Sequence, residues 1–443
     1  MPLIGLTDPP LVRTAPRRFA GRGSKATVAS AAELEGAAAT DSATLSAVRI
    51  RPTAKRVPRI PLMSQIPAEI LHDEALNQAI ALLPANYDFE VHKCVWHIRR
   101  YNCARVALQM PEGLLIYSCV IADILERFCD GVEVVVMGDV TYGACCVDDY
   151  TAAALGCDLL IHYAHSCLVP VDVTSMRVLY VFVTISIDVG HLSNTLEAAF
   201  SPNTRLAVVG TIQFNPALHA LRASFPEHTA KSISIDVPQI VPLSRGELLG
   251  CTAPRIDPTK TDAIVYIGDG RFHLESAMIH NPGLPAYRYD PYSRKLTEEE
   301  YAHAEMLAVR RDALLSAAKH AKHVGLILGT LGRQGNYATF DKIKRNLEGK
   351  GITYTLILLS EIFPQKLAEF EHIDAFVQVA CPRLSIDWGY AFAKPLLTPY
   401  EASIAWGDLH LWGDLQDIIA GTAEPYKMDY YAKDGLGRES LKR

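Results

Sequence analysis

Apolar residues along most of this chain follow two alternating patterns, one typical of strands and one typical of helices. Short β-branched runs predict strands over 104–110, 132–137, 158–163, 205–210, 231–236, 263–267, 324–328, 353–359 and 375–379. Helical spacing of apolar residues predicts helices over 73–83, 89–101, 114–128, 216–225, 297–320, 337–348 and 362–370. Because strands joined by helical crossovers pair in parallel, this alternation predicts an α/β fold with parallel sheets.

The strand–helix order recurs three times, as an internal repeat on the scale of a domain. We therefore expect three homologous α/β domains, each a small parallel β-sheet flanked by helices, arranged as a triangle around a central cleft. Their predicted bounds are 61–172, 173–292 and 293–425, and a chain of 443 residues is long enough for several cores. Residues 426–443 are predicted to form a C-terminal tail.

The N-terminal extension, residues 1–60, differs in composition from the rest of the chain. It is rich in Ala, Ser, Thr, Pro and Arg, has no aromatic residue after Phe19, and carries ten Lys or Arg against four Asp or Glu. Such a segment buries too little apolar surface to fold alone, so we expect it to be disordered. Several arginines with few acids also resemble a mitochondrial transit peptide, which is the alternative interpretation.

Charge and hydropathy restrict the class of protein. The formal charge is −6, so the body beyond the basic extension is acidic and does not fit direct nucleic-acid binding. The longest apolar run, 178–187, is too short to span a membrane. Ten cysteines without local pairing patterns, and no secretory signal, predict a reducing, cytoplasmic location.

Three cysteines occupy similar places in the repeat. Cys145 lies in the turn Tyr142–Asp149, Cys251 in a Gly-Cys-Thr-Ala-Pro turn, and Cys381 in an Ala-Cys-Pro-Arg turn, each near the end of a predicted strand. An open α/β sheet presents ligands at the carboxyl ends of its strands, so three similar units could bring one thiolate each to a shared centre. The chain has none of the Cys-x2–4-Cys pairs that zinc sites usually contain.

The other cysteines have a simpler interpretation. A single cysteine is most often a small buried apolar residue. Cys146 would point away from its neighbour Cys145 and is expected to pack. The same interpretation is applied to Cys94, Cys103, Cys119, Cys129 and Cys157, while Cys167 is left open.

Several longer motifs resemble those of one family, the diphthamide synthases, which make the first intermediate of diphthamide. The motifs are Tyr142–Asp149, Pro238–Pro254, Asp269–Glu275, Gly329–Gly335 and Ala380–Gly389, and the resemblance covers roughly residues 60–400. In this family three cysteines from three homologous domains hold a [4Fe–4S] cluster. Matched motif by motif, they fall on Cys145, Cys251 and Cys381.

The resemblance implies an enzyme that uses this cluster together with S-adenosyl-L-methionine. Three thiolates leave one of four irons without a protein ligand, and that iron can bind S-adenosylmethionine and pass it an electron. The family breaks the bond between sulfur and Cγ, releases methylthioadenosine, and adds the 3-amino-3-carboxypropyl radical to a histidine of translation elongation factor 2. The Cys-x3-Cys-x2-Cys run of related radical enzymes is absent. The implied partners are a homologous second subunit, forming a heterodimer, and a small iron-binding electron donor.

Turns between a first strand and the following helix are the expected sites for the cosubstrate. Backbone amides in 109–113 and 329–335 suit the methionyl carboxylate, and Arg333 could add a two-pronged hydrogen bond. The alternative is that the glycines only form tight turns, and a dinucleotide site is disfavoured because Gly-x-Gly-x-x-Gly is missing. The predicted contacts are Gln109, Pro111, Glu112, Gly113, Asp269, Gly270, Gly329, Thr330, Gly332, Arg333 and Gln334.

Histidines and carboxylates give weaker indications. His273 either lines the site or is structural, while His162 and His165 are expected to pack or to support the site. No catalytic residue beyond the cluster ligands is predicted. Two alternatives for function remain open: an accessory subunit of the same complex with an electron-transfer or structural role, or a non-catalytic α/β protein that binds zinc or another metal.

Overall fold

The computed structural model describes residues 25–26, 66–225 and 233–438 of the chain. Of the N-terminal extension, the short strand β1 (Lys25–Ala26) is described. Apart from these two residues, the predicted disorder of residues 1–60 lies outside the described part of the chain.

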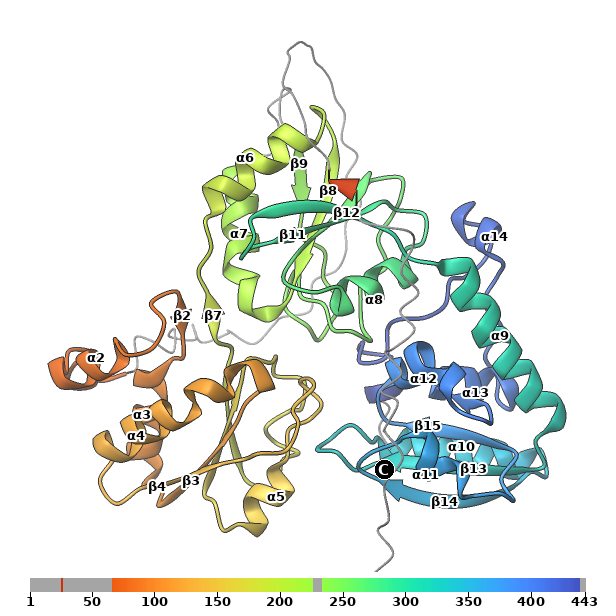
Figure 1. Ribbon diagram of the computed structural model, residues 1–443, viewed down its shortest axis with the longest axis horizontal. Coiled ribbons are helices and arrows are strands. Elements are labelled where there is room, and N and C mark those ends of the chain that lie inside the picture. Colours follow the sequence, from red (N-terminus) through yellow and green to blue (C-terminus); the bar gives the residue numbers. More distant parts are fainter. Residues whose placement is uncertain (1–24, 27–65, 226–232, 439–443) are drawn as a thin grey trace, which may run out of the picture.

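Three separate sheets carry the fold, and each contains a set of four parallel strands (Figure 1). The first unit has β3 (Arg105–Gln109), β4 (Glu133–Val136), β5 (Leu159–Tyr163) and β6 (Arg177–Val181). The second has β8 (Arg205–Gly210), β9 (Ser234–Asp236), β10 (Ala263–Ile267) and β11 (Ala286–Asp290). The third has β13 (His323–Gly329), β14 (Thr353–Leu359), β15 (Ala375–Val379) and β16 (Leu396–Leu397).

The four parallel strands lie in the same spatial order in every unit. Counted along the chain within a unit, that order is second, first, third, fourth. Directly before each third strand stands an aspartate, Asp158, Asp262 or Asp374, whose carboxylate accepts backbone N–H bonds at the start of the first strand. A common order and a common aspartate confirm an α/β fold built from repeated parallel sheets.

The second sheet departs from the prediction of a purely parallel sheet. It is extended by β12 (Lys295–Glu299), antiparallel to β11, and by β1, antiparallel to β12. The predicted helix 297–320 was therefore wrong at its start, and α9 begins at His303. The cause is tertiary: the buried Glu299 carboxylate binds Arg271 at 2.8 Å and Arg288 at 3.0 Å, which fixes the segment as a strand.

Helices flank the sheets of all three units. The first unit has α1 (Ala68–Leu71), α2 (Glu74–Ile80), α3 (Val91–Tyr101), α4 (Ser118–Phe128) and α5 (Asp149–Ala154). The second has α6 (Val189–Ala199), α7 (Asn215–Ser224) and α8 (Phe272–His280). The third has α9 (His303–His320), α10 (Tyr337–Gly349), α11 (Pro364–Ala368), α12 (Pro382–Trp388), α13 (Pro399–Ala405) and α14 (Leu415–Ile419).

A two-stranded antiparallel sheet, β2 (Tyr87–Asp88) with β7 (Thr184–Ile185), lies at the connection between the first two units. No helix in the described part combines the length and apolarity needed to cross a membrane.

Further differences from the sequence prediction concern helices, and α6, α12, α13 and α14 are among those that were not predicted. The predicted helix 114–128 starts as a 3-10 turn, Glu112–Tyr117, and becomes α-helical only at Ser118. Helix α8 was not predicted at all. Its residues 274–280 are all buried, so the segment lacks the polar face on which helical periodicity depends.

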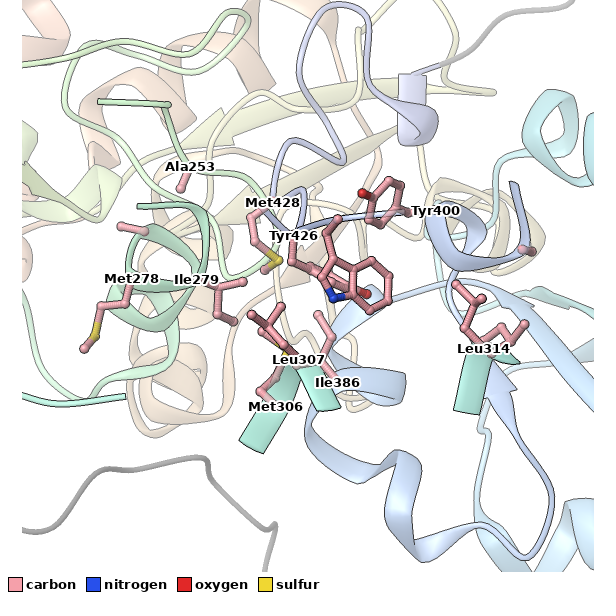
Figure 2. Close-up of a cluster of buried hydrophobic side chains, with 14 of the residues drawn as sticks. Ala253, Met278, Ile279, Met306, Leu307, Leu314, Ile386, Tyr400, Tyr426 and Met428 are labelled. Atoms are coloured by element: carbon pink, nitrogen blue, oxygen red, sulfur yellow. The ribbon is translucent and has the colours of Figure 1, made fainter. Parts of the chain in front are cut away.

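The second and third units share one continuous core. Ala253 and Met278 of the second unit belong to the same cluster as Leu314 and Ile386 of the third. Figure 2 shows Met428 lying between these two groups. The first unit has separate cores of its own.

The segment predicted as a C-terminal tail takes part in this packing. Tyr426 and Met428 are buried in the shared core, and Tyr430 and Tyr431 are buried beside the cysteine loops. Residues 426–438 are thus an integral part of the described structure rather than a loose end, and residues 439–443 lie outside the described part.

Candidate metal centre

The first cysteine loop follows β4 and is held by side chains from the sheet beneath it. The Cys146 carbonyl accepts a 2.8 Å hydrogen bond from Gln109 Nε2, at the end of β3. Gln109 Oε1 can only accept, so the Nδ1–H of His162 donates to it at 2.8 Å. His162 is fully buried, and its Nε2 lies 3.2 Å from His165 Nδ1. Gln109 is thereby a support of the Cys145–Cys146 turn, and both histidines have the supporting position expected of them.

A second support of the first loop comes from the turn 329–335 of the third unit. The Arg333 N–H donates to the Cys145 carbonyl at 2.9 Å, and the Arg333 guanidinium binds both carboxylate oxygens of Asp149 at 2.7 and 2.6 Å. Gln334 Nε2 lies 3.4 Å from Cys146 Sγ. The guanidinium therefore has Asp149 of the same chain as a partner, and its predicted contact with a ligand carboxylate stays a prediction. The turn joins the third unit to the first.

Two glycines of this turn allow the close approach. Gly332 has a φ of +52°, in the left-handed region, and a Cβ added there would lie 2.5 Å from the carbonyl carbon of Cys146. A Cβ added at Gly329 would lie 2.5 Å from the Cβ of Ala380, the residue before Cys381. The interpretation of these glycines as tight-packing positions therefore has a direct structural basis.

The second cysteine loop is paired with the C-terminal segment. The Cys251 carbonyl accepts a hydrogen bond of 3.2 Å from the Tyr430 N–H, and the Ala253 N–H donates to the Met428 carbonyl at 2.7 Å. The Tyr431 N–H donates to the hydroxyl of Thr252, the residue after Cys251, at 2.9 Å. These bonds give the loop a fixed backbone although no strand of the sheet continues through it.

The third cysteine loop is fixed against the second. Cys381 is the N-cap of α12, and its carbonyl accepts a 2.9 Å hydrogen bond from Gln378. Arg383 is only 3% exposed and donates to the carbonyls of Gly250, at 3.2 Å, and Phe272, at 2.7 Å. Because Gly250 directly precedes Cys251, Arg383 holds two of the cysteine loops in register.

The three thiols act on one another electrostatically. The pKa of Cys251 is raised to about 12 by burial and then by Cys381. The pKa of Cys145 is raised by its neighbour Cys146, by burial, and then by Cys381 and Cys251. Burial raises the pKa of Cys381 to about 11. Cys145 packs against the apolar cluster that contains Cys251, and Arg383 of the third loop binds the Gly250 carbonyl. The three loops, which come from three different units, therefore converge on a common space.

The kind of metal that this space could hold is restricted by its geometry. Within residues 66–225 and 233–438, no group of three His, Cys, Asp or Glu is placed to hold a metal ion. In a polynuclear iron–sulfur cluster each cysteine binds a different iron, so the thiolates need not share one ion. Three thiolates are a donor set that suits such a cluster.

Two imidazoles lie next to this space. Burial, and after it the neighbouring His273, lower the pKa of His165 to about 3. Burial lowers the pKa of His273 to about 4, with Arg383 as the second cause. Both rings are therefore neutral at physiological pH, and His273 is placed close to Arg383 of the third loop.

The remaining predicted cosubstrate residues lie at the ends of strands and stay predictions. Pro111 is the N-cap of the 3-10 turn after β3. The solvent-exposed members of this set are Glu112, Gly113, Asp269, Gly270 and Thr330.

The other cysteines mostly have the buried positions expected of them. Cys94, Cys103, Cys129, Cys146 and Cys157 are buried, and all ten cysteines are free. The expectation that Cys146 points away from Cys145 is wrong, because the Cys146 thiol interacts with the thiols of Cys145 and Cys381. Cys119 is an exception to the prediction, because it is exposed on α4, whose buried face is formed by Ser118, Ile121, Ile124 and Leu125. Cys167, which was left open, is exposed.

The sequence analysis missed Tyr430 and Tyr431. Their rings are 6% exposed and belong to the cluster that contains Cys251, against which Cys145 packs. A usable signal was present, because Tyr426, Tyr430 and Tyr431 lie in a segment taken as a tail, and disordered tails contain few aromatic residues.

Fold and site define a class of protein with three repeated α/β units that bring one cysteine each to a common space. Residues 110–416 match the family model described as "Putative diphthamide synthesis protein". The chain belongs to this family.

Curated relatives match over most of their length. The Candida albicans protein named 2-(3-amino-3-carboxypropyl)histidine synthase subunit 1 is 60% identical to this chain. The match covers 88% of this chain and 88% of the relative. The protein of that name in Saccharomyces cerevisiae is 58% identical and covers 85% of this chain and 86% of the relative. This level of identity agrees with the match to the family model.

Solved structures share the fold. The crystal structure of Dph2 from Pyrococcus horikoshii with a 4Fe-4S cluster has a TM-score of 0.60 at 24% identity, covering 74% of this chain and 93% of that chain. A second structure of Dph2 from the same organism has a TM-score of 0.59 at 25% identity, covering 80% and 97%.

Proposed function

We propose that this chain is the catalytic subunit for the first step of diphthamide synthesis. It transfers a 3-amino-3-carboxypropyl group from S-adenosyl-L-methionine to a histidine of translation elongation factor 2. The observation that carries the proposal is the convergence of Cys145, Cys251 and Cys381 from three repeated units. The name of the curated relatives, which specifies this group and a histidine, supports it.

The three cysteines are proposed to hold a [4Fe–4S] cluster. The residues present fit that group, because three thiols meet in apolar surroundings beside two buried hydroxyls that lack a nitrogen or oxygen partner among the described residues. The 4Fe-4S cluster of the Pyrococcus Dph2 structure supports the assignment. When bound, such a cluster with three thiolates supplies an open iron that can bind and reduce S-adenosylmethionine.

The protein's own side chains position the centre. Gln109 and Arg333 hold the turn of Cys145, and Arg383 holds the loop of Cys251 against that of Cys381. Because these contacts are buried, the loops keep their geometry while cosubstrate binds and leaves. For the cosubstrate we keep the half-buried Pro111, the exposed strand-end residues Glu112, Gly113, Asp269, Gly270 and Thr330, and the backbone of Gly329.

The proposal extends to organisation and partners. The repeated units are proposed to be three homologous domains placed as a triangle around the shared centre. The first unit extends beyond the expected bound of 172, because β6 belongs to its sheet, and the second extends beyond 292, because β12 belongs to its sheet. The word "subunit" in the relatives' name supports a complex, which we propose to be a heterodimer with a homologous second subunit. A small iron-binding protein is the proposed electron donor, and the cytoplasm is the proposed location.

The cofactor and the cleavage chemistry are tested by one anaerobic experiment. Reconstituted protein with its partner subunit is analysed for iron and sulfide, reduced, and given S-adenosylmethionine alone. We expect about four irons and four sulfides per cluster, and release of methylthioadenosine. Release of 5′-deoxyadenosine would contradict the proposed bond cleavage, and a colourless, sulfide-free zinc protein would favour the non-catalytic alternative.

A further inference from the structure

Two buried hydroxyl groups lie beside the three cysteines, and neither has a nitrogen or oxygen hydrogen-bond partner among the described residues. They belong to Tyr430 and Tyr431. A buried polar group left unpaired is destabilising, so native proteins contain few of them unless a ligand supplies the partner. The walls around these hydroxyls are apolar and include Leu168 and Leu243. A bound group is therefore the expected source of the missing acceptors.

The tyrosines are held in place by a segment that touches all three units, residues 426–438, which we term the C-terminal strap. Its hydrogen bonds to the second unit are those that Met428, Tyr430 and Tyr431 make with the Cys251 loop. The Asn336 amide of the third unit donates to the Gly437 carbonyl at 2.9 Å, and Arg438 donates to the Leu168 carbonyl of the first unit at 3.2 Å. The Gly437 N–H donates to the Tyr430 carbonyl at 2.7 Å, which closes the strap on itself. Both hydroxyls consequently have fixed positions.

Both rings lie within electrostatic range of the cysteines. The pKa of Tyr430 is raised by burial and then by Cys251, Cys381 and Cys145. The pKa of Tyr431 is raised by burial and then by Cys145, with Tyr430 and Cys251 contributing. The hydroxyl of Tyr430 therefore interacts electrostatically with all three cysteines. Among the cysteines, Cys145 has the largest effect on the hydroxyl of Tyr431.

We propose that Tyr430 and Tyr431 donate O–H···S hydrogen bonds to the sulfur atoms of the iron–sulfur centre, and so raise its reduction potential. This inference rests on the proposed function. A neutral tyrosine has one O–H donor, and the sulfur atoms of a cluster and its thiolates are acceptors. One-electron reduction adds one negative charge to the centre, so donors aimed at its sulfur stabilise the reduced form more than the oxidised form.

The test removes the hydroxyls and keeps the rings. Tyr430→Phe, Tyr431→Phe and the double variant are reconstituted with iron and sulfide, and their midpoint potentials are measured by titration followed by electron paramagnetic resonance. We expect the double variant to hold about tenfold less reduced cluster at a fixed potential, which is a downward shift of about 59 mV for one electron. Electron–nuclear double resonance should also lose couplings to exchangeable protons.

The matched control is Tyr266→Phe. Tyr266 is fully buried in β10 with an unpaired hydroxyl, but the charges that act on it are those of Asp269 and Arg288 rather than cysteines. The Tyr266→Phe variant should keep the wild-type reduction potential and proton couplings. The single variants should give smaller shifts, and they keep the comparison valid if the double variant loses iron.

Two results would overturn the inference. If cluster-loaded variants kept the wild-type potential and proton couplings, the hydroxyls would not bond to the centre, while the proposed function would stand. If wild-type protein assembled no iron and sulfide, the proposed function and this inference would both fail.

Discussion

Cys381→Ala should abolish the iron–sulfur chromophore of the reconstituted protein. With two thiolates remaining, a second iron would lose its protein ligand. Iron and sulfide should fall to a small fraction of the wild-type content, and S-adenosylmethionine cleavage should disappear. Cys145→Ala and Cys251→Ala should behave in the same way.

The matched control for these variants is Cys129→Ala. Cys129 is buried in the core of the first unit, and the other thiol that acts on it is Cys103 rather than a member of the centre. This variant should lose some stability through a small cavity and keep its full iron content. If Cys129→Ala and Cys381→Ala lost iron equally, the assignment of ligands would be wrong.

Arg383→Met should destabilise the protein by about 3–5 kcal/mol, because it leaves buried carboxylates without their main partner. Arg383 forms ion pairs with Glu275 and, at 2.9 Å, with Asp387, and both the arginine and Glu275 are 3% exposed. It also anchors the Gly250 carbonyl. The expected result is a lower denaturation midpoint of the apoprotein together with a reduced iron content.

Arg345→Met provides the comparison for this variant. Arg345 pairs with Asp341 one helical turn away on α10 and is 63% exposed. Exposed pairs contribute below about 1 kcal/mol, so this change should be nearly neutral in both measurements. Equal effects of the two substitutions would mean that Arg383 does not hold the loops together.

The repeated α/β order was predictable because the central strands of each parallel sheet are buried on both faces. Strand Ala263–Ile267 is therefore a continuous apolar run, and Ala375–Val379 is apolar except for Gln378, so both stand out from the sequence. Segments fixed by distant partners were not predictable. Strand β12 has a helical composition, but two arginines bind Glu299 and hold it extended.

The same distinction applies to the site. The three cysteines could be picked out because each follows a strand end and matches a family motif. The roles of Arg333 and Gln109 could not be predicted, because a side chain that can bind a ligand can equally well hold a neighbouring loop. Only the three-dimensional contact of Arg333 with Asp149, 184 residues away, separates these roles. The C-terminal strap was missed because its hydrogen bonds are made to loops rather than to a sheet.

The most direct test of the central claim is mass spectrometry of translation elongation factor 2 after anaerobic reaction. The reaction contains reconstituted protein, its partner subunit, a reductant and S-adenosylmethionine. The account predicts one 3-amino-3-carboxypropyl group on a histidine of the factor, formed with methylthioadenosine. A methyl or adenosyl adduct would contradict the proposed chemistry, and no adduct despite a reducible cluster would assign this chain an accessory role instead.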